Sequence, residues 1–123
     1  MEIKDRLKRL GKLLERLKEG YVFVEGKKDK KALEKLGITN VLTISGNLRL
    51  SCDKVEKGTV VVLTDLDRRG DELAVAAKDE LERHSISVDL ETRKMLAHTL
   101  RIRYFEDVKR AYDELIKEGE KNG

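Results

Sequence analysis

The chain contains the stretch Val60-Val61-Val62-Leu63-Thr64-Asp65-Leu66-Asp67-Arg68-Arg69-Gly70, in which a short apolar run ends at two aspartates. The run is rich in β-branched residues and too short for a helix, so it predicts a buried strand over residues 59–64 that stops at a charged edge. Side chains two positions apart point the same way in extended backbone, so Asp65 and Asp67 can face one point if strand geometry continues through Leu66. Two carboxylates that face one point are candidate ligands for a divalent cation.

A second apolar run, Tyr21-Val22-Phe23-Val24, ends at a carboxylate followed by glycine, Glu25-Gly26. A helical pattern over residues 27–37 and a further apolar run at residues 41–44 follow it. Strand, helix and strand in this order predict a βαβ unit with a parallel sheet and a right-handed crossover. Ligand crevices of such sheets lie beyond the carboxyl ends of the strands, so Glu25 is expected beside the two aspartates. Three converging acids repel one another, so at least one should have a raised pKa unless a cation lies among them.

Periodicity predicts the remaining elements. They are a helix over residues 2–19, a helix over 71–84, a candidate edge strand over 86–90 and a helix over 107–118. The connections are predicted to be irregular: a loop at 45–50, a polar segment at 53–58 and a frayed tail at 119–123, while 91–98 fits no single pattern. The fold class is therefore α/β, with a four-stranded, mainly parallel sheet flanked by helices in one domain, residues 1–123.

Composition limits the compartment and the class of partner. No apolar segment approaches the ~18 residues of a membrane span and the N-terminus lacks a signal peptide's apolar region, so a cytoplasmic protein without a membrane partner is expected. Cys52 is the only cysteine, which excludes an intrachain disulfide and a Cys-based zinc site. The 27 Lys and Arg against 24 Asp and Glu give a net charge of +3, which does not by itself imply a polyanionic partner. A charged fraction of 41% without any glutamine is typical of a thermophilic source.

The two edge motifs together resemble a known family. Val24-Glu25-Gly26-Lys27-Lys28-Asp29, followed later by Leu63-Thr64-Asp65-Leu66-Asp67-Arg68-Arg69-Gly70, is similar to the Toprim domain of topoisomerases, bacterial primases, OLD-family nucleases and the maturation ribonucleases that trim ribosomal RNA precursors. The chain as a whole is most similar to the small stand-alone Toprim proteins of archaea and thermophilic bacteria. The resemblance covers residues 20–103, with the helices at 2–19 and 107–118 as flanking elements, and implies a Rossmann-like fold.

The resemblance also implies chemistry. Glu25 matches the motif glutamate that serves as general acid or base in nucleotidyl transfer or helps to hold metal. Asp65 and Asp67 match the aspartates that coordinate Mg²⁺, for which Mn²⁺ can substitute. Asp71 lies where topoisomerases have a further acid, although an acid at a helix start is the simpler interpretation. The chain lacks DNA-gate domains and an evident tyrosine nucleophile, which excludes strand passage by this chain alone.

Three functions are compatible with these features. The first is a Mg²⁺-dependent, nuclease-like protein that acts on RNA or DNA phosphodiesters. The second is a metal- and nucleic-acid-binding module without independent catalysis that works in a larger complex. The third is an interaction protein in which the carboxylate edge is a relic. The leucine-rich first helix is a candidate homodimer surface, or else it packs on the sheet.

Several cations near the predicted edge are candidate phosphate contacts. They are Lys27, Lys28, Arg49, Arg68 and Arg69, with Asn47 as a neutral donor. Each has an alternative interpretation as a solvent-exposed loop residue. The stretch 91–103 is also basic, through Arg93, Lys94, Arg101 and Arg103, and extends a candidate nucleic-acid track. No aromatic residue is interleaved among these cations, so base stacking is poorly supported.

Overall fold

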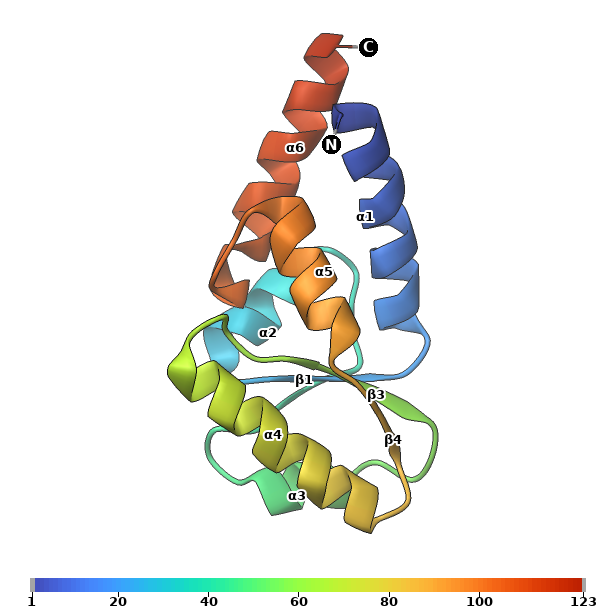
Figure 1. Ribbon diagram of the computed structural model, residues 1–123, viewed down its shortest axis with the longest axis vertical. Coiled ribbons are helices and arrows are strands. Elements are labelled where there is room, and N and C mark those ends of the chain that lie inside the picture. Colours follow the sequence, from blue (N-terminus) through green and yellow to red (C-terminus); the bar gives the residue numbers. More distant parts are fainter. Residues whose placement is uncertain (1, 123) are drawn as a thin grey trace.

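The computed structural model describes residues 2–122 and contains one parallel sheet with helices on both faces (Figure 1). In the described range the sheet has four strands in the order β2-β1-β3-β4: β1 is Tyr21–Val24, β2 is Val41–Thr43, β3 is Thr59–Leu63 and β4 is Ser87–Asp89. Every neighbouring pair is parallel, so the carboxyl ends of all four strands lie at the same edge. The predicted α/β class is confirmed, and β4 is the expected edge strand.

The helices form a layer on each face of the sheet (Figure 1). One layer contains α1, Ile3–Lys18; α2, Lys27–Glu34; α5, Glu91–Leu100; and α6, Val108–Asn122, which follows the short 3-10 helix η1, Phe105–Asp107. The other contains α3, Leu48–Asp53, and α4, Arg68–Arg83. This arrangement is Rossmann-like. None of the helices in residues 2–122 combines the length and apolarity needed to cross a bilayer.

The sheet separates two apolar layers, and strand alternation assigns each side chain to one of them. Val22 and Val24 of β1 pack with α1, α2, α5 and α6, whereas Phe23 between them packs with α3 and α4. Val61 and Leu63 likewise face the first layer, and Val60 and Val62 the second. Burial on both faces explains why β1 and β3 are continuous apolar runs in the sequence.

The apolar stripe of α1 is covered within the chain. Leu10, Leu13 and Leu17 are buried in the core that includes α5 and α6. The two terminal helices approach so closely that a Cβ added at Gly119 of α6 would lie 2.5 Å from Leu7 Cδ1 of α1. The stripe that made this helix a candidate dimer surface is thus used for intramolecular packing.

Three segments between the predicted elements differ from expectation. Residues 45–50 are not wholly a loop, because α3 begins at Leu48, and the polar connection begins only after Asp53. A helix of six residues is too short for periodicity to reveal. The unassigned segment 91–98 lies in α5, whose buried face includes the polar side chains of Thr92 and Arg93 and so hides the apolar pattern.

The remaining differences concern helix ends. α6 continues to Asn122 through the predicted frayed tail, because Gly119 lies in the helix against α1 rather than ending it. α4 begins at Arg68 instead of residue 71, because Asp67 caps it. A helix start three residues before the predicted one is within the usual uncertainty of helix boundaries predicted from sequence.

Candidate functional site

The carboxyl ends of β1 and β3 bring two acids together. Val24 pairs with Leu63 in the parallel register, so the residues that follow each strand are neighbours. The Asp65 backbone N–H donates a 2.7 Å hydrogen bond to Glu25 Oε2. Glu25 and Asp65, far apart in the chain, therefore lie side by side at the edge of the sheet.

The Asp65 carboxylate is held in a partly buried and electronegative position. Its Oδ1 accepts a 3.0 Å hydrogen bond from the backbone N–H of Phe105 in η1. The pKa of Asp65 is raised to about 7, chiefly by burial and in addition by the Glu25 and Asp29 carboxylates, while the hydrogen bond from Phe105 N–H opposes the shift. Burial is thus the main cause of the raised pKa, and the repulsion expected of converging acids adds to it.

A third acid, Asp29 of α2, belongs to the same group. Its side chain is buried, and Asp29 Oδ2 accepts a 3.0 Å hydrogen bond from the Gly26 N–H at the helix start. Burial raises the pKa of Asp29, and the Glu25 and Glu106 carboxylates raise it further. We call Glu25, Asp29 and Asp65 the carboxylate cluster. In the sequence, Asp29 is only the last residue of the stretch that carries the Glu25-Gly26 motif; its position four residues after Glu25, in the first turn of the next helix, was the available signal.

Asp67 has a different local role. Asp65 and Asp67 could share one direction only if strand geometry continued through Leu66. β3 instead ends at Leu63, and the chain bends at Leu66 and Asp67, so this condition is not met. Asp67 is instead the N-cap of α4, and its Oδ1 accepts a 2.7 Å hydrogen bond from Gly70 N–H. Across residues 2–122, no three His, Cys, Asp or Glu side chains are grouped so that they could hold a metal ion together.

Arg93 of α5 is buried beneath this edge and fixes its backbone. Its Nε donates to the Thr64 carbonyl at 2.7 Å, and its Nη2 donates to the Asp65 carbonyl at 2.7 Å and to Asp71 Oδ1 at 2.6 Å. Only 4% of the side chain is exposed. The prediction that Arg93 belongs to an exposed basic track is therefore wrong: the guanidinium supports the turn that carries Asp65.

The candidate phosphate contacts divide into two groups. Four lie in the first turns of helices that begin at the carboxyl edge: Lys27 and Lys28 in α2, and Arg68 and Arg69 in α4. All four are exposed. They lie on the helix starts that follow Glu25 and Asp65 in the chain, and the first-turn amides of these helices also favour anions.

The other two candidates have local partners. Asn47 caps α3 by accepting a 3.0 Å hydrogen bond from Leu50 N–H. Arg49 Nε lies 3.8 Å from Glu80 Oε1. At 1.5 Å per residue, Glu80 lies about 20 Å along the α4 axis from Asp67, the N-cap of that helix. Because Arg49 contacts Glu80, its side chain is directed away from the carboxylate cluster.

The raised pKa of Asp65 predicts how stability depends on pH in metal-free buffer. Aspartate in the unfolded chain ionises near ~3.9, whereas folded Asp65 keeps its proton up to about 7. The folded state thus binds more protons between these values, so this contribution to the free energy of unfolding falls as pH rises from ~4 to ~7. We expect the Tm of the wild type minus that of Asp65→Asn, measured in EDTA, to decrease over this range. A constant difference would contradict the assignment.

Comparison with known proteins reveals related chains. The chain is 38% identical over 97 residues to a UPF0292 protein of Thermococcus onnurineus, which covers 75% of this chain and 73% of the relative. It is 37% identical over 100 residues to a UPF0292 protein of Pyrococcus horikoshii, covering 75% and 74%. A UPF0292 protein of Methanosarcina barkeri is 34% identical over 100 residues, covering 74% and 70%.

A solved structure and a scan of family models complete the comparison. A protein of Aquifex aeolicus is 32% identical in sequence and superposes with a TM-score of 0.69, covering 81% of this chain and 94% of that protein. No family model matches the chain. Because the chain aligns with more than two thirds of several relatives above 30% identity, it belongs to the UPF0292 family.

Proposed function

We propose that this protein is a Mg²⁺-dependent, Toprim-type protein that acts on nucleic-acid phosphodiesters in a nuclease-like manner. The observation that carries the proposal is the pairing of Glu25 and Asp65 at the carboxyl edge of a parallel sheet, where Asp65 is destabilised as an anion. The motif order, Glu-Gly after one strand and Asp-x-Asp after its neighbour, supports the same interpretation.

The donor set fits a hard divalent cation. All the candidate ligands are carboxylate oxygens, which Mg²⁺ and Mn²⁺ prefer, and a cation there would stabilise the Asp65 anion that burial and the neighbouring carboxylates disfavour. Glu25 and Asp65 would hold the ion, while Asp67 remains the N-cap of α4. Mg²⁺ is commonly held by one or two protein carboxylates and completed by water and substrate phosphate, so the site does not require three preformed ligands.

The residues around the ion would divide the chemical work. The bound metal would neutralise the phosphodiester and activate the attacking water or hydroxyl. Glu25, oriented by the Asp65 N–H, would transfer the proton. Arg68 and Arg69, at the start of α4, would bind phosphate with the first-turn amides. Arg93 would act as a positioning residue through the Thr64 and Asp65 carbonyls.

The second candidate function is a metal- and nucleic-acid-binding module that works in a larger complex. The capping role of Asp67 favours it, because one of the three predicted ligands is already engaged by Gly70 N–H. In this case the metal would order a nucleic acid at the edge without cleaving it.

Substitution Glu25→Gln separates the two functions. The amide oxygen can still accept from Asp65 N–H, but the side chain can no longer transfer a proton, so Mg²⁺-dependent cleavage should fall by about 10²–10⁴-fold while oligonucleotide binding is retained. Cleavage of labelled RNA and DNA and fluorescence anisotropy provide the two readouts. Glu56→Gln, at an exposed position before β3, is the control and should retain both. Unchanged cleavage in Glu25→Gln would exclude Glu25 as the proton-transfer group. A wild-type protein that binds both the metal ion and the oligonucleotide but does not cleave the oligonucleotide would favour the second function.

A further inference from the structure

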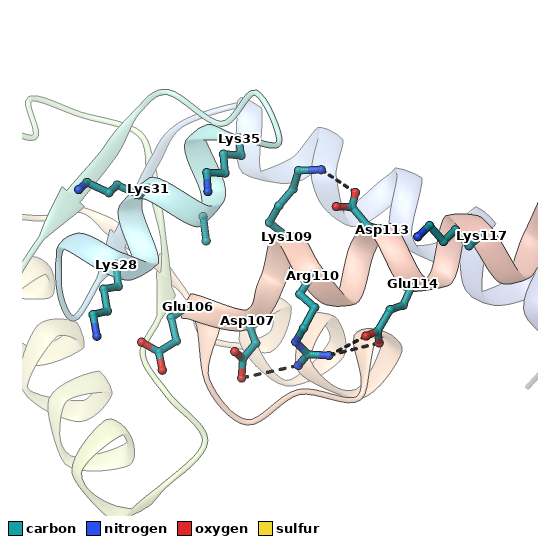
Figure 2. A pocket seen from close by; sticks show the side chains of 11 residues that line it. Lys28, Lys31, Lys35, Glu106, Asp107, Lys109, Arg110, Asp113, Glu114 and Lys117 are labelled. Atoms are coloured by element: carbon teal, nitrogen blue, oxygen red, sulfur yellow. Dashed lines mark hydrogen bonds and ion pairs between the residues drawn. The ribbon is translucent and has the colours of Figure 1, made fainter.

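A groove of about 720 Å³ lies between α2 on one side and η1 with α6 on the other (Figure 2). It is separate from the α4 side of the carboxyl edge, where the Arg68 and Arg69 phosphate contacts were placed. Its lining contains six basic and four acidic side chains and no aromatic side chain. The distribution of ion pairs among these charges determines what the groove can bind.

The α2 wall carries a row of unpaired lysines. Lys28, Lys31 and Lys35 follow one another at intervals of three and four residues, which places them on one face of the helix. All three are exposed, and none has an ion-pair partner within residues 2–122. The row is about 10 Å long at 1.5 Å per residue.

On the α6 wall, most charges neutralise one another. Lys109 Nζ lies 2.6 Å from Asp113 Oδ1, and Arg110 Nη1 lies 3.1 Å from Glu114 Oε1 (Figure 2). Asp107 Oδ2 is also 3.8 Å from Arg110 Nη2. These pairs neutralise Lys109 and Arg110, but the four acids of η1 and α6 still exceed the three bases of that wall by one. Across the whole groove, six basic and four acidic side chains leave a net charge of +2, and this excess comes from the lysine row of the α2 wall.

One end of the groove meets the carboxylate cluster. Glu106 lines the groove and directly follows Phe105, whose backbone N–H donates to Asp65 Oδ1, and on the opposite wall Lys28 directly precedes Asp29 of the cluster. Figure 2 shows Glu106 and Lys28 at the same end of the groove, opposite Lys117. A polyanion lying along the lysine row would thus reach the cluster at the Lys28 end.

We infer that this groove binds the phosphate backbone of a single-stranded nucleic acid and leads the strand to the carboxylate cluster. The delivery of the strand to the cluster rests on the proposed function, whereas binding in the groove does not. Lysine ammonium groups are suited to phosphate as point charges. The groove volume of about 720 Å³ is small, which favours a single strand over a duplex. The lining offers no ring for base stacking, so binding should be independent of base identity.

The test is the salt dependence of binding in EDTA. The probes are labelled oligodeoxythymidine and oligouridine of about 20 nucleotides, which is longer than the usual binding site for a single strand. Their binding affinity is measured by fluorescence anisotropy from ~50 to ~200 mM KCl. The groove variant carries Lys28→Gln, Lys31→Gln and Lys35→Gln. Its matched control carries Lys54→Gln, Lys57→Gln and Lys78→Gln, three exposed lysines near α3 and on α4.

The groove variant should lose about 2 units of the slope of log K against log salt, at ~0.7 per single-strand phosphate contact, and at least about tenfold in affinity at low salt. The control should keep most of the wild-type slope. A variant in which the three groove lysines are replaced by arginine should also show the wild-type slope, because the positive charges are kept. Equal losses in the groove and control variants, or no loss in either, would overturn the inference. Equally tight duplex binding that depends on the same lysines would overturn the single-strand assignment.

The same assay distinguishes this inference from the proposed metal chemistry. In EDTA, the double variant Asp65→Asn, Asp67→Asn should bind the oligonucleotide at least as tightly as the wild type, because it removes repelling charges and leaves the lysine row intact. Groove binding combined with an absence of metal binding would overturn only the proposed function. Metal binding with a groove variant that binds oligonucleotide normally would overturn only the groove.

Discussion

Replacing Arg93 with methionine is expected to lower the free energy of unfolding by about 2–6 kcal/mol. The guanidinium is the hydrogen-bond donor to the carbonyls of Thr64 and Asp65 at the end of the central strand β3. Methionine fills a similar volume but donates nothing, and each buried acceptor left without a donor costs about 1–3 kcal/mol. Urea unfolding monitored by circular dichroism measures the change.

The ion pair of Arg93 with Asp71 should contribute much less. The Asp71 side chain is 67% exposed, so solvent screens the attraction and the pair is worth about 0–1 kcal/mol. Asp71→Asn is therefore the matched control, expected to change stability by less than ~1 kcal/mol. Equal losses in Arg93→Met and Asp71→Asn would show that the ion pair, rather than support of the two carbonyls, is the main contribution of Arg93.

Gly70→Ala should be destabilising by about 3 kcal/mol or more, although alanine is normally the better helix former. A Cβ at this position would overlap the Asp65 carbonyl oxygen and would lie 2.7 Å from the carbonyl carbon. The obstacle is backbone that Arg93 holds in place, so it cannot move aside as a flexible side chain would. The loss of stability should therefore reach or exceed the upper end of the roughly 1–3 kcal/mol that overpacking typically costs. Thr64 Oγ1, which donates to the Gly70 carbonyl at 2.6 Å, restrains the turn further.

Gly11→Ala is the control for this substitution. Gly11 lies within α1 on an exposed surface, and an added Cβ would meet nothing within 4 Å. Helix propensity then decides the sign, and we expect a gain of about 0.5–1 kcal/mol. Stabilisation by both alanines in thermal unfolding would contradict the close packing of α4 against the Asp65 carbonyl.

The sequence was sufficient to predict the sheet and the meeting of Glu25 with Asp65. Both follow from local patterns, since apolar runs that end at carboxylates identify β1 and β3, and parallel strands bring such ends to one edge. The N-cap role of Asp67 was also available locally, because aspartate is a preferred cap at a helix start. The Asp-x-Asp pattern also predicts a cation ligand at Asp67, and the sequence alone does not show which of the two roles the residue takes.

The supports of the site could not be predicted in this way. Asp65 receives its hydrogen bond from Phe105, 40 residues away, and the carbonyl of Asp65 receives one from Arg93, 28 residues away. These contacts depend on how α5 and η1 pack on the sheet, which no short pattern encodes. An arginine among other basic residues resembles a surface charge, and only its burial shows that it serves the backbone instead.

Calorimetric titration with Mg²⁺ and Mn²⁺ tests the central claim, that the edge of the sheet around Glu25 and Asp65 is a divalent-cation site. The wild type is compared with the double variant Asp65→Asn, Asp67→Asn, in which the amide at position 67 can still cap α4. Each protein is titrated with and without a single-stranded oligonucleotide, because substrate phosphate commonly completes a magnesium site. The proposed function predicts saturable heat in the wild type that disappears in the variant. Flat titrations of the wild type under both conditions, or the same heat in both proteins, would contradict it.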